Sequence, residues 1–372
     1  MKPSELVEAF AQRFGSRPRL FRAPGRINLI GEHTDYNEGF VLPAPIDRFC
    51  LVATAPNNEG RLRIVSADLG LEASADAGCF ARTGDWSDYV CGVFFALRAA
   101  GLRPPACDLI VASHVPMGAG VSSSAALEVA VALALAALAG ETPSLDEVAR
   151  LARIAEQDFV GMPCGPMDQI VCALGRDRRA LLLDCRSLSS RSAPIPDGAA
   201  FVVVDSGVRH RLREGGYEAR RADCEAAAAA LGVSSLRDAT MAAVEASDLP
   251  PRLRARARHV VGENARCLAA ADSLERGDLA ALGRLMAESH ESLRADFEVT
   301  CPETDAIVER VSVLPGVHGA RQIGGGFGGA VLALVEDRDA EAVRREAATL
   351  VPASAAPAFI CSIVGGAGEV TA

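Results

Sequence analysis

The spacing of apolar residues along the chain predicts several helices. Between residues 144 and 161, apolar side chains recur every three or four positions, which places them on one face of a helix. Ser144 and Glu147 have the spacing of a capping box at its start, and Gly161 is a suitable stop. Similar spacing predicts helices at residues 4–14, 85–101, 122–140, 339–350 and, with breaks, 215–297.

Shorter apolar runs bounded by turn residues predict strands between these helices. Residues 20–33 are expected to form two short strands around a Pro-Gly turn, and residues 317–336 two strands joined by a glycine-rich loop. Because strands and helices do not alternate regularly, the pattern favours an α+β fold over a doubly wound parallel sheet. Further strands are predicted at residues 40–56, 60–70, 106–116, 179–189, 199–208 and 358–364.

Length and a polar interruption divide the chain. At 372 residues it is too long for one ordinary hydrophobic core, which indicates two domains. The segment 187–198 is polar and contains Pro and Gly, so it is a candidate linker. We therefore predict an N-terminal domain at residues 1–195 and a C-terminal domain at residues 196–372.

The charge balance disfavours some partners and leaves others open. With 38 basic and 48 acidic residues, the formal net charge is −10, which argues against nucleic acid or an anionic membrane as the main partner. Lys2 is the only lysine, so no interior lysine can serve a phosphate-binding P-loop or a Schiff base. Any phosphate chemistry must use backbone N–H groups, arginine and a metal ion.

The cysteines and the apolar stretches indicate the cellular compartment of the protein. Eleven cysteines are scattered without a CxxC pair, which is typical of reduced thiols in a cytosolic protein. The first fifteen residues have the pattern of a short amphipathic helix and not of a signal peptide. The longest apolar stretch, residues 129–139, is too short to cross a bilayer. We expect a cytoplasmic protein with no membrane partner.

The segment VPMGAGVSSSAALE, residues 115–128, has the composition of an anion-binding loop. Gly118 and Gly120 allow the backbone to approach a ligand closely, and a predicted helix follows. The N–H groups of its first turn lack partners inside the helix and lie at the positive end of the helix dipole. Val121 follows the second glycine where a P-loop has lysine, so serine hydroxyls take the place of the ammonium group. A serine-capped helix without a ligand is the simpler alternative.

Asp168 and Glu156 are candidate functional carboxylates. Asp168 follows the Pro- and Gly-rich segment GMPCGPM, and a carboxylate on a short rigid loop suits a catalytic role. A turn residue that only bonds its neighbouring backbone is the alternative. Glu156 lies at the border of the apolar face of the helix at residues 144–161, where it can bind a cation or form a structural ion pair.

The glycine-rich segment at residues 319–335, GARQIGGGFGGAVLALV, matches the dinucleotide pattern GxGxxG in its spacing. A dinucleotide-binding fold needs a helix after the glycines, whereas the apolar run that follows them predicts a strand. We therefore expect a loop that passes close to a ligand or to the loop at residues 115–128.

Glu32, His33 and Asp35 form a further polar cluster in RINLIGEHTDYNEGF, residues 26–40. Their spacing matches neither an HExxH zinc motif nor a set of Cys/His pairs. They can form a solvated turn, or they can recognise a sugar, because carboxylates and imidazole pair with neighbouring hydroxyl groups. The residues alone leave both interpretations open.

Together the four segments resemble the GHMP small-molecule kinases and, within them, the galactokinases. GRINLIGEHTDYNEGFVLP is similar to the galactokinase signature, and PMGAGVSSSAA resembles the phosphate loop of the wider family. GMPCGPMDQ and GGGFGGAVLALV are similar to its two remaining blocks. The resemblance implies an α+β, two-domain GHMP kinase fold: an N-terminal domain like ribosomal protein S5 domain 2, a ferredoxin-like C-terminal α/β domain, and the active site in the cleft between them.

The resemblance also implies roles for individual residues. Asp168 corresponds to the catalytic aspartate and Arg26 to the arginine beside it. Ser124 and Glu156 correspond to magnesium ligands. The residues implied to contact the sugar are Glu32, His33, Thr34, Asp35 and Tyr217. The residues implied to hold ATP are Gly118, Ala119, Gly120, Val121, Ser122, Ser123 and Ser124 at the phosphates and Ser66 at the nucleotide.

The reaction implied by the resemblance is transfer of the γ-phosphoryl group of ATP to the anomeric hydroxyl of D-galactose. ATP and Mg²⁺ are the implied cofactors, galactose and ATP are the implied partners, and a monomer is expected. Related kinases of N-acetylgalactosamine or arabinose, and a non-catalytic galactose sensor, stay open as alternatives. The GEHTDYN stretch disfavours mevalonate and homoserine as substrates.

Overall fold

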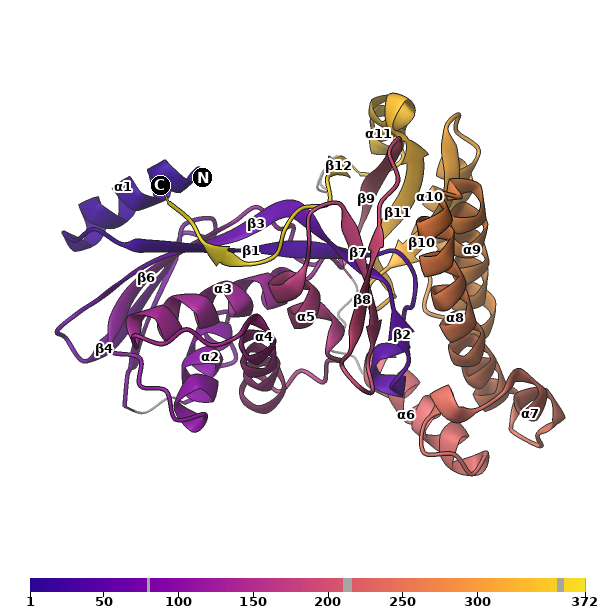
Figure 1. Cartoon of the computed structure of the whole chain (residues 1–372), viewed down its shortest axis with the longest axis horizontal. Helices are drawn as coiled ribbons and strands as arrows, with labels where there is room; N and C mark the ends of the chain where they lie inside the picture. Colours follow the sequence, from indigo (N-terminus) through magenta and orange to yellow (C-terminus); the bar gives the residue numbers. More distant parts are fainter. Residues whose placement is uncertain (79–80, 210–215, 353–357, 372) are drawn as a thin grey trace.

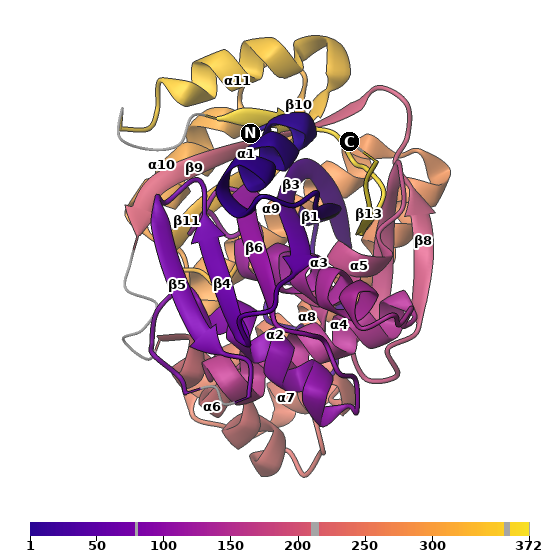
Figure 2. The same ribbon diagram turned by 90° about the vertical axis from the view of Figure 1, so that its left-hand side faces the viewer.

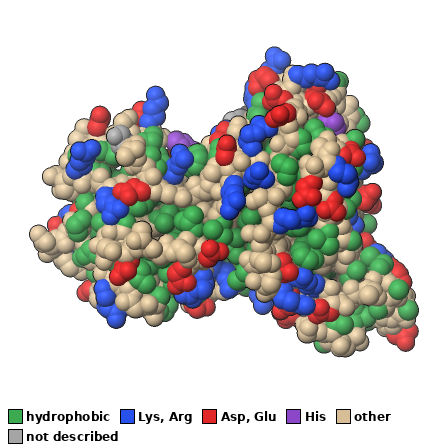
Figure 3. Space-filling model, viewed as in Figure 1, with side chains coloured by type: hydrophobic (Ala, Val, Ile, Leu, Met, Phe, Trp, Pro, Cys, Tyr) green, Lys and Arg blue, Asp and Glu red, His purple; other side chains and the backbone are tan. Residues whose placement is uncertain are grey.

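The computed structural model describes residues 1–78, 81–209, 216–352 and 358–371. Two halves stand side by side, and the long helices α8, α9 and α10 lie on the outer side of the second (Figure 1). The space-filling outline narrows between the halves, and acidic and basic side chains are intermixed on the face that Figure 3 shows. The mixture of helices and sheets confirms the predicted α+β class.

A six-stranded sheet forms the centre of the first half. Its strand order is β13-β1-β3-β6-β4-β5, with β4 and β6 parallel and the other pairs antiparallel. Figure 2 shows this sheet with α1 and the group α2 to α5 at different sides. The strands are β1 (Arg19–Asn28), β3 (Pro43–Pro56), β4 (Arg61–Ser66), β5 (Leu71–Asp76), β6 (Cys107–Ser113) and β13 (Gly368–Glu369).

Alternation along the strands explains why both faces of this sheet are covered. Successive side chains point to opposite faces, so Leu20 and Leu51 pack with α1 while Phe21 and Val52 join the main core with the other helices. The helices predicted in this half are present as α1 (Pro3–Phe14), α2 (Asp88–Ala99), α3 (Ser123–Leu138) and, over the first part of residues 144–161, α4 (Leu145–Ile154). A further helix, α5 (Met167–Leu174), was not predicted.

The second half is built on a four-stranded antiparallel sheet in the order β10-β11-β9-β12. Val202 of β9 packs in a cluster with α10 and α11, whereas Val203 joins the main core with α8 and α9. The strands are β9 (Ala199–Arg209), β10 (Val317–Ile323), β11 (Gly328–Glu336) and β12 (Phe359–Cys361). The helices are α6 (Gly216–Ala230), α7 (Met241–Ala246), α8 (Pro251–Arg276), α9 (Leu279–Ser292), α10 (Pro302–Ser312) and α11 (Ala340–Ala348).

A small third sheet corrects the prediction of a linker at residues 187–198. Its order is β2-β7-β8, and β8 lies inside the predicted linker, where it pairs with residues 179–183 of β7. Small polar residues suit an edge strand, which explains why this segment looked like a loop. The boundary at residue 195 stays a prediction, and β13 returns to pair with β1. The strands are β2 (Phe40–Val41), β7 (Arg179–Asp184) and β8 (Ser190–Pro194).

Two further predictions need correction. Residues 19–28 form one continuous strand with a bulge between Pro24 and Arg26, because a bulge absorbs the missing N–H of proline without ending the strand. The helix predicted over residues 144–161 changes after Ile154 into a π-helical segment, η2 (Ala155–Val160). Ser144 is the N-cap as predicted, since the Glu147 N–H donates to Ser144 Oγ at 3.2 Å, but the Glu147 carboxylate bonds Arg150 and does not complete a capping box.

Short segments complete the architecture. The 3₁₀ turns are η1 (Asp35–Asn37), η4 (Leu236–Asp238) and η6 (Asp337–Asp339), and a second π-helical segment is η5 (Leu293–Phe297). The cysteines within the described ranges are free thiols, as their spacing predicts. None of the helices in those ranges combines the length and the apolar character needed to cross a bilayer.

Candidate active site

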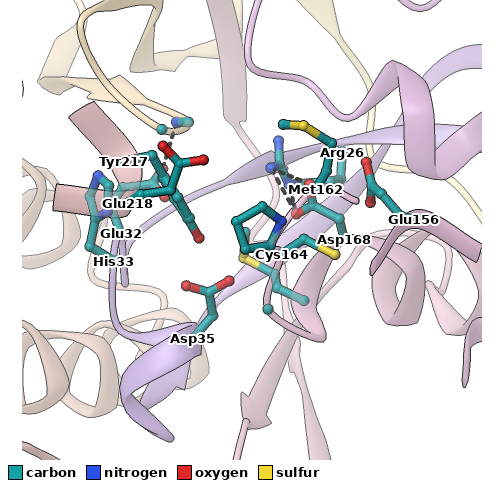
Figure 4. Close-up of a pocket in the computed structure, with 15 residues that line it drawn as sticks. Arg26, Glu32, His33, Asp35, Glu156, Met162, Cys164, Asp168, Tyr217 and Glu218 are labelled. Atoms are coloured by element: carbon teal, nitrogen blue, oxygen red, sulfur yellow. Dashed lines mark hydrogen bonds and ion pairs between the residues drawn. The ribbon is translucent and has the colours of Figure 1, made fainter. Parts of the chain in front are cut away.

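A pocket between the two halves brings together the two residues predicted for catalysis and most of those predicted to contact the sugar (Figure 4). Glu32, His33 and Tyr217 lie at one side of the close-up, and Arg26, Asp168 and Glu156 lie at the other. The lining comes from β1 and the segment after it, from η2 and α5, and from α6 and the glycine-rich loop of the second half. Predicted site residues that line the pocket are Arg26, Glu32, His33, Asp35, Glu156, Asp168 and Tyr217.

Arg26 and Asp168 form a two-pronged ion pair. Arg26 Nε donates to Asp168 Oδ1 at 2.9 Å and Arg26 Nη2 donates to Oδ2 at 2.9 Å. The arginine is buried, which by itself lowers its pKa, but the charges of Asp168 and Glu32 outweigh burial and leave the pKa raised. Asp168 therefore faces a permanent positive charge in a fixed, bidentate geometry. It stands in the first turn of α5, and not on a loop as predicted.

Ser122 completes the surroundings of this carboxylate. Its hydroxyl donates to Asp168 Oδ2 at 2.5 Å, so three donor groups converge on one side chain. Ser122 precedes α3 with φ 60, a left-handed conformation that a residue other than glycine rarely adopts. Such backbone strain concentrates at functional positions, where the surroundings enforce it. The serine-rich loop and the carboxylate thus face each other, as the sequence hypothesis required.

The phosphate-type loop leads directly into α3. Gly118 and Gly120 have φ of 72 and 69, which a residue with a Cβ adopts only at a cost. A Cβ on Gly120 would lie 3.1 Å from the Ile323 carbonyl oxygen, and a Cβ on Gly324 would lie 3.0 Å from Gly120 Cα. The two glycine-rich loops therefore touch, which confirms the predicted proximity. Arg26 Nη1 donates to the Gly120 carbonyl oxygen at 2.5 Å and ties the loop to the ion pair.

Glu156 and Ser124 are brought together beside Asp168. Burial and the Asp168 charge raise the pKa of Glu156, while a hydrogen bond from Ser124 lowers it in part. Gln169 Nε2 donates to Glu156 Oε2 at 2.6 Å and to Glu128 Oε2 at 3.0 Å. The described residues contain no group of three or more His, Cys, Asp or Glu side chains arranged to hold a metal ion. The Ser124 hydroxyl and the buried Glu156 carboxylate are hard oxygen ligands, and they fit a Mg²⁺ ion that takes its other ligands from phosphates and water.

The other end of the pocket is aromatic and polar. His33 packs against Tyr36 and Tyr217, with ring centroids 5.8 Å and 5.7 Å away, and His33 Nδ1 lies 2.9 Å from the Tyr36 hydroxyl. Burial lowers the pKa of His33 to about 3, so the ring is neutral. Within the described residues, its buried Nε2 has no hydrogen-bond partner. Burial and the charge of Asp168 raise the pKa of Asp35 to about 7. These groups are available to pair with ligand hydroxyls.

The predicted site residues outside the pocket lining are the loop residues Gly118 to Ser124, described above, and also Thr34 and Ser66. Thr34 is fully buried, and its hydroxyl bonds the carbonyl oxygens of Gly31 and Phe40, which shapes the loop from inside. Ser66 ends β4 in the N-terminal sheet, where its hydroxyl accepts from the Leu69 N–H at 3.4 Å. The sequence motif gave no means of telling a loop-forming threonine from one that faces a ligand.

Pocket residues that sequence reasoning missed belong to the same short segments. Met162 and Cys164 line the pocket from the segment before α5, and Glu218 lines it beside Tyr217. Gly165 contacts Asp35 so closely that a Cβ would collide with its carboxylate. The turn-forming composition of GMPCGPM could have identified Met162, Cys164 and Gly165 as pocket residues, because a tight turn brings all of its residues near Asp168.

A two-domain α+β fold, in which a serine-rich loop before a helix faces a carboxylate held by arginine, is the arrangement expected of the GHMP small-molecule kinases. Models of the GHMP kinases N terminal domain and the GHMP kinases C terminal family match residues 88–176 and 270–353. The galactokinase galactose-binding signature matches residues 8–56. The chain belongs to the galactokinase family. A galactokinase from Roseiflexus sp. is 44% identical over 98% of this chain and 97% of its own length, and one from Chloroflexus aggregans is 47% identical over 90% and 88%.

Solved structures agree with this assignment. The structure of Lactococcus lactis galactokinase complexed with galactose matches with a TM-score of 0.92 and 31% identity over 99% of each chain. The Methanococcus jannaschii mevalonate kinase matches with a TM-score of 0.71 at 17% identity, over 95% of this chain and 100% of that chain. This second likeness concerns the fold alone. The two-domain GHMP kinase fold expected from the sequence is therefore confirmed.

Proposed function

We propose that this protein transfers the γ-phosphoryl group of ATP to the anomeric hydroxyl of D-galactose and releases galactose 1-phosphate and ADP. One observation carries the proposal: a carboxylate fixed by Arg26 and Ser122 stands between a phosphate-type loop and a pocket end rich in hydroxyl-pairing groups. Membership of the galactokinase family supports the choice of galactose as the sugar.

Asp168 is the proposed general base. The two-pronged pair with Arg26 holds the carboxylate of Asp168 in a fixed orientation at the pocket wall, where it can accept the proton of a bound hydroxyl group. An anomeric hydroxyl is still protonated at neutral pH, so a base that takes its proton as the oxygen attacks phosphorus raises the rate. Arg26 has a second proposed role, because a guanidinium group at the same place stabilises negative charge on the transferring phosphoryl group.

Gly118 to Ser124 are proposed to hold the ATP phosphates. The start of α3 offers N–H groups without intrahelical partners, and serine hydroxyls supplement them. Ser124 and Glu156 are the proposed Mg²⁺ ligands, and a bound Mg²⁺ ion would neutralise phosphate charge. Phosphoryl transfer depends mainly on alignment and electrostatics, which explains how the site manages without an interior lysine. The role of Ser66 near the nucleotide stays a prediction.

Glu32, His33, Asp35 and Tyr217 are the proposed contacts of galactose. A buried site built to bond each hydroxyl rejects a sugar that presents one in the wrong place, because a buried polar group is then left unpaired. Thr34 is proposed to act through the shape of the loop and not through contact with the sugar. A cytoplasmic location and a monomeric state stay predictions, and free thiols suit a reducing compartment.

A coupled assay of ADP release with a panel of sugars tests the proposal. Galactose is expected to give the highest kcat/KM, and the product is expected to carry its phosphate on C1 by nuclear magnetic resonance. Preference for N-acetylgalactosamine or arabinose would assign a related sugar kinase instead. Galactose binding without ADP release would assign a sensor.

A further inference from the structure

The loop that carries the sugar-facing residues is anchored by the other half of the molecule. Figure 1 shows β2, which ends this loop, beside α8. His259 Nε2 of α8 lies 3.1 Å from the Glu32 carbonyl oxygen, and Asn264 Oδ1 accepts from the Phe40 N–H at 2.8 Å. These partners lie 227 and 224 positions later in the sequence. The geometry of the sugar end thus depends on a helix that the sugar itself does not reach.

Glu263 is the central group of this anchor. Its Oε1 accepts from the N–H of Gly31 at 2.9 Å, from the N–H of Glu32 at 3.3 Å and from Ser289 Oγ at 2.7 Å. Two successive N–H groups converge on one oxygen because Gly31 has φ 102, a conformation open to glycine. Such a pair of N–H groups forms an anion-binding nest, and here the anion is a side chain of the protein.

Buried charges connect Glu263 to the side chain of Glu32. Arg321 is fully buried, its Nη2 lies 3.9 Å from Glu263 Oε1, and its Nη1 lies 3.4 Å from Glu32 Oε1. Arg266 Nε donates to the second oxygen of Glu263 at 2.8 Å. Burial by itself raises the pKa of Glu263. The pKa is nevertheless lowered to about 2, because of the charges of Arg266, His259 and Arg321 and a hydrogen bond from Ser289. If the Glu263 charge were removed, the buried Arg321 would keep Glu32 as a carboxylate partner but lose Glu263, which destabilises a buried charge.

We propose that Glu263 is a positioning residue for the sugar: through the N–H groups of Gly31 and Glu32 and through Arg321, it fixes the direction in which Glu32 and His33 face the pocket. Glu263 is fully buried and does not line the pocket, so its effect on the sugar is indirect. The proposal rests on the proposed function of the pocket. It adds that the affinity for the sugar is set by a charge in the second half of the molecule.

Glu263→Gln and Glu263→Ala test this inference. Each variant is expected to raise the Kd for galactose at least about tenfold in calorimetric titrations without ATP, since bonds to a buried charge are lost. The KM for ATP is expected to stay within about twofold, because none of the bonds that Glu263 itself makes reaches the phosphate loop. Asp108→Asn is the matched control: it removes another buried carboxylate, ion-paired to Arg63 at 2.6 Å, from the N-terminal sheet. Its Kd for galactose is expected to match that of the unmodified chain.

The results separate positioning from general structural support. An unchanged Kd in a folded Glu263 variant overturns the inference, and so does an equal rise in the Kd for galactose and the KM for ATP. Should both variants fail to fold, Ser289→Ala decides: at least a twofold rise in Kd supports positioning, and an unchanged Kd contradicts it. If the unmodified chain binds another sugar better, the proposed substrate is wrong, and the same titrations with that sugar still test Glu263.

Discussion

The two ends of the pocket are built in different ways. The phosphoryl-transfer end draws Arg26, the loop before α3 and Asp168 from the first half, where short contacts tie them to one another. The sugar end is a loop of the first half whose backbone is held by α8 and whose Glu32 side chain is held by β10. If the proposed function is right, catalytic alignment depends mainly on contacts within the first half, whereas sugar recognition depends on the packing of the two halves.

The largest effect is expected at the phosphoryl-transfer end. Asp168→Asn keeps the shape of the side chain but removes the base and its charge. We expect kcat to fall by about 10² to 10⁴-fold, because that is the usual contribution of a general base. Calorimetry should show galactose binding within a few-fold of the unmodified chain. Near-normal kcat in a folded variant would remove Asp168 from its proposed role.

A change at the sugar end should give the opposite pattern. Asp35→Ala is expected to raise the KM for galactose about 10- to 100-fold, because it removes an acceptor for a ligand hydroxyl from the pocket. The KM for ATP should change by less than about threefold. Steady-state kinetics with each substrate varied in turn measures both, and equal rises would contradict the division between the two ends.

Ser122 belongs to the phosphate loop but bonds Asp168, so its substitution tests how the loop supports the carboxylate. Ser122→Ala and Ser122→Gly are both expected to lower kcat by about tenfold through loss of one hydrogen bond to a charged group. Glycine relieves the left-handed strain at this position and alanine does not. The two variants should therefore differ in thermal midpoint while sharing the loss of kcat. A loss of kcat that tracked stability would indicate a purely structural role.

The smallest effect concerns the pH dependence of stability. The pKa of Asp35 is about 7 in the folded chain against an ordinary value near 3.8, so the folded state holds this proton more tightly than the unfolded state. Its stabilising contribution is complete below pH 4 and is lost as pH rises through 7. Asp35→Asn does not titrate, so between pH 5 and 8 it should gain about 1 kcal/mol of unfolding free energy relative to the unmodified chain, allowing for partial solvent exposure. Urea unfolding at both pH values measures the gain, and a constant difference would refute it.

The two ends also differ in how far the sequence could predict them. The phosphate loop is formed by contiguous residues, Gly118, Gly120 and the serines that follow. Its existence, the start of α3 and the contact with the second glycine-rich segment were therefore predictable. The sugar end was predictable only as a list of polar residues. Its anchors, Glu263 and Arg321, stand in ordinary helix and strand patterns, and nothing local marks them as buried.

Local deviations from regular structure were equally hidden. The change from α- to π-helix after Ile154 places Glu156 in the pocket lining, but the apolar spacing of residues 144–161 continues through it. A bulge at Pro24 keeps β1 continuous where Pro-Gly predicted a turn. In both cases pairing and packing with distant segments decided the backbone, and single-segment patterns do not contain that information.

A crystal structure of the unmodified chain with galactose and a non-hydrolysable ATP analogue would show directly whether Asp168 meets the anomeric hydroxyl group. We expect the anomeric oxygen within about 3 Å of an Asp168 carboxylate oxygen and the γ-phosphate at the start of α3. The remaining sugar hydroxyl groups should bond Glu32, His33 and Asp35. A sugar bound with its C1 hydroxyl directed away from Asp168, or outside the pocket between the halves, would contradict this expectation.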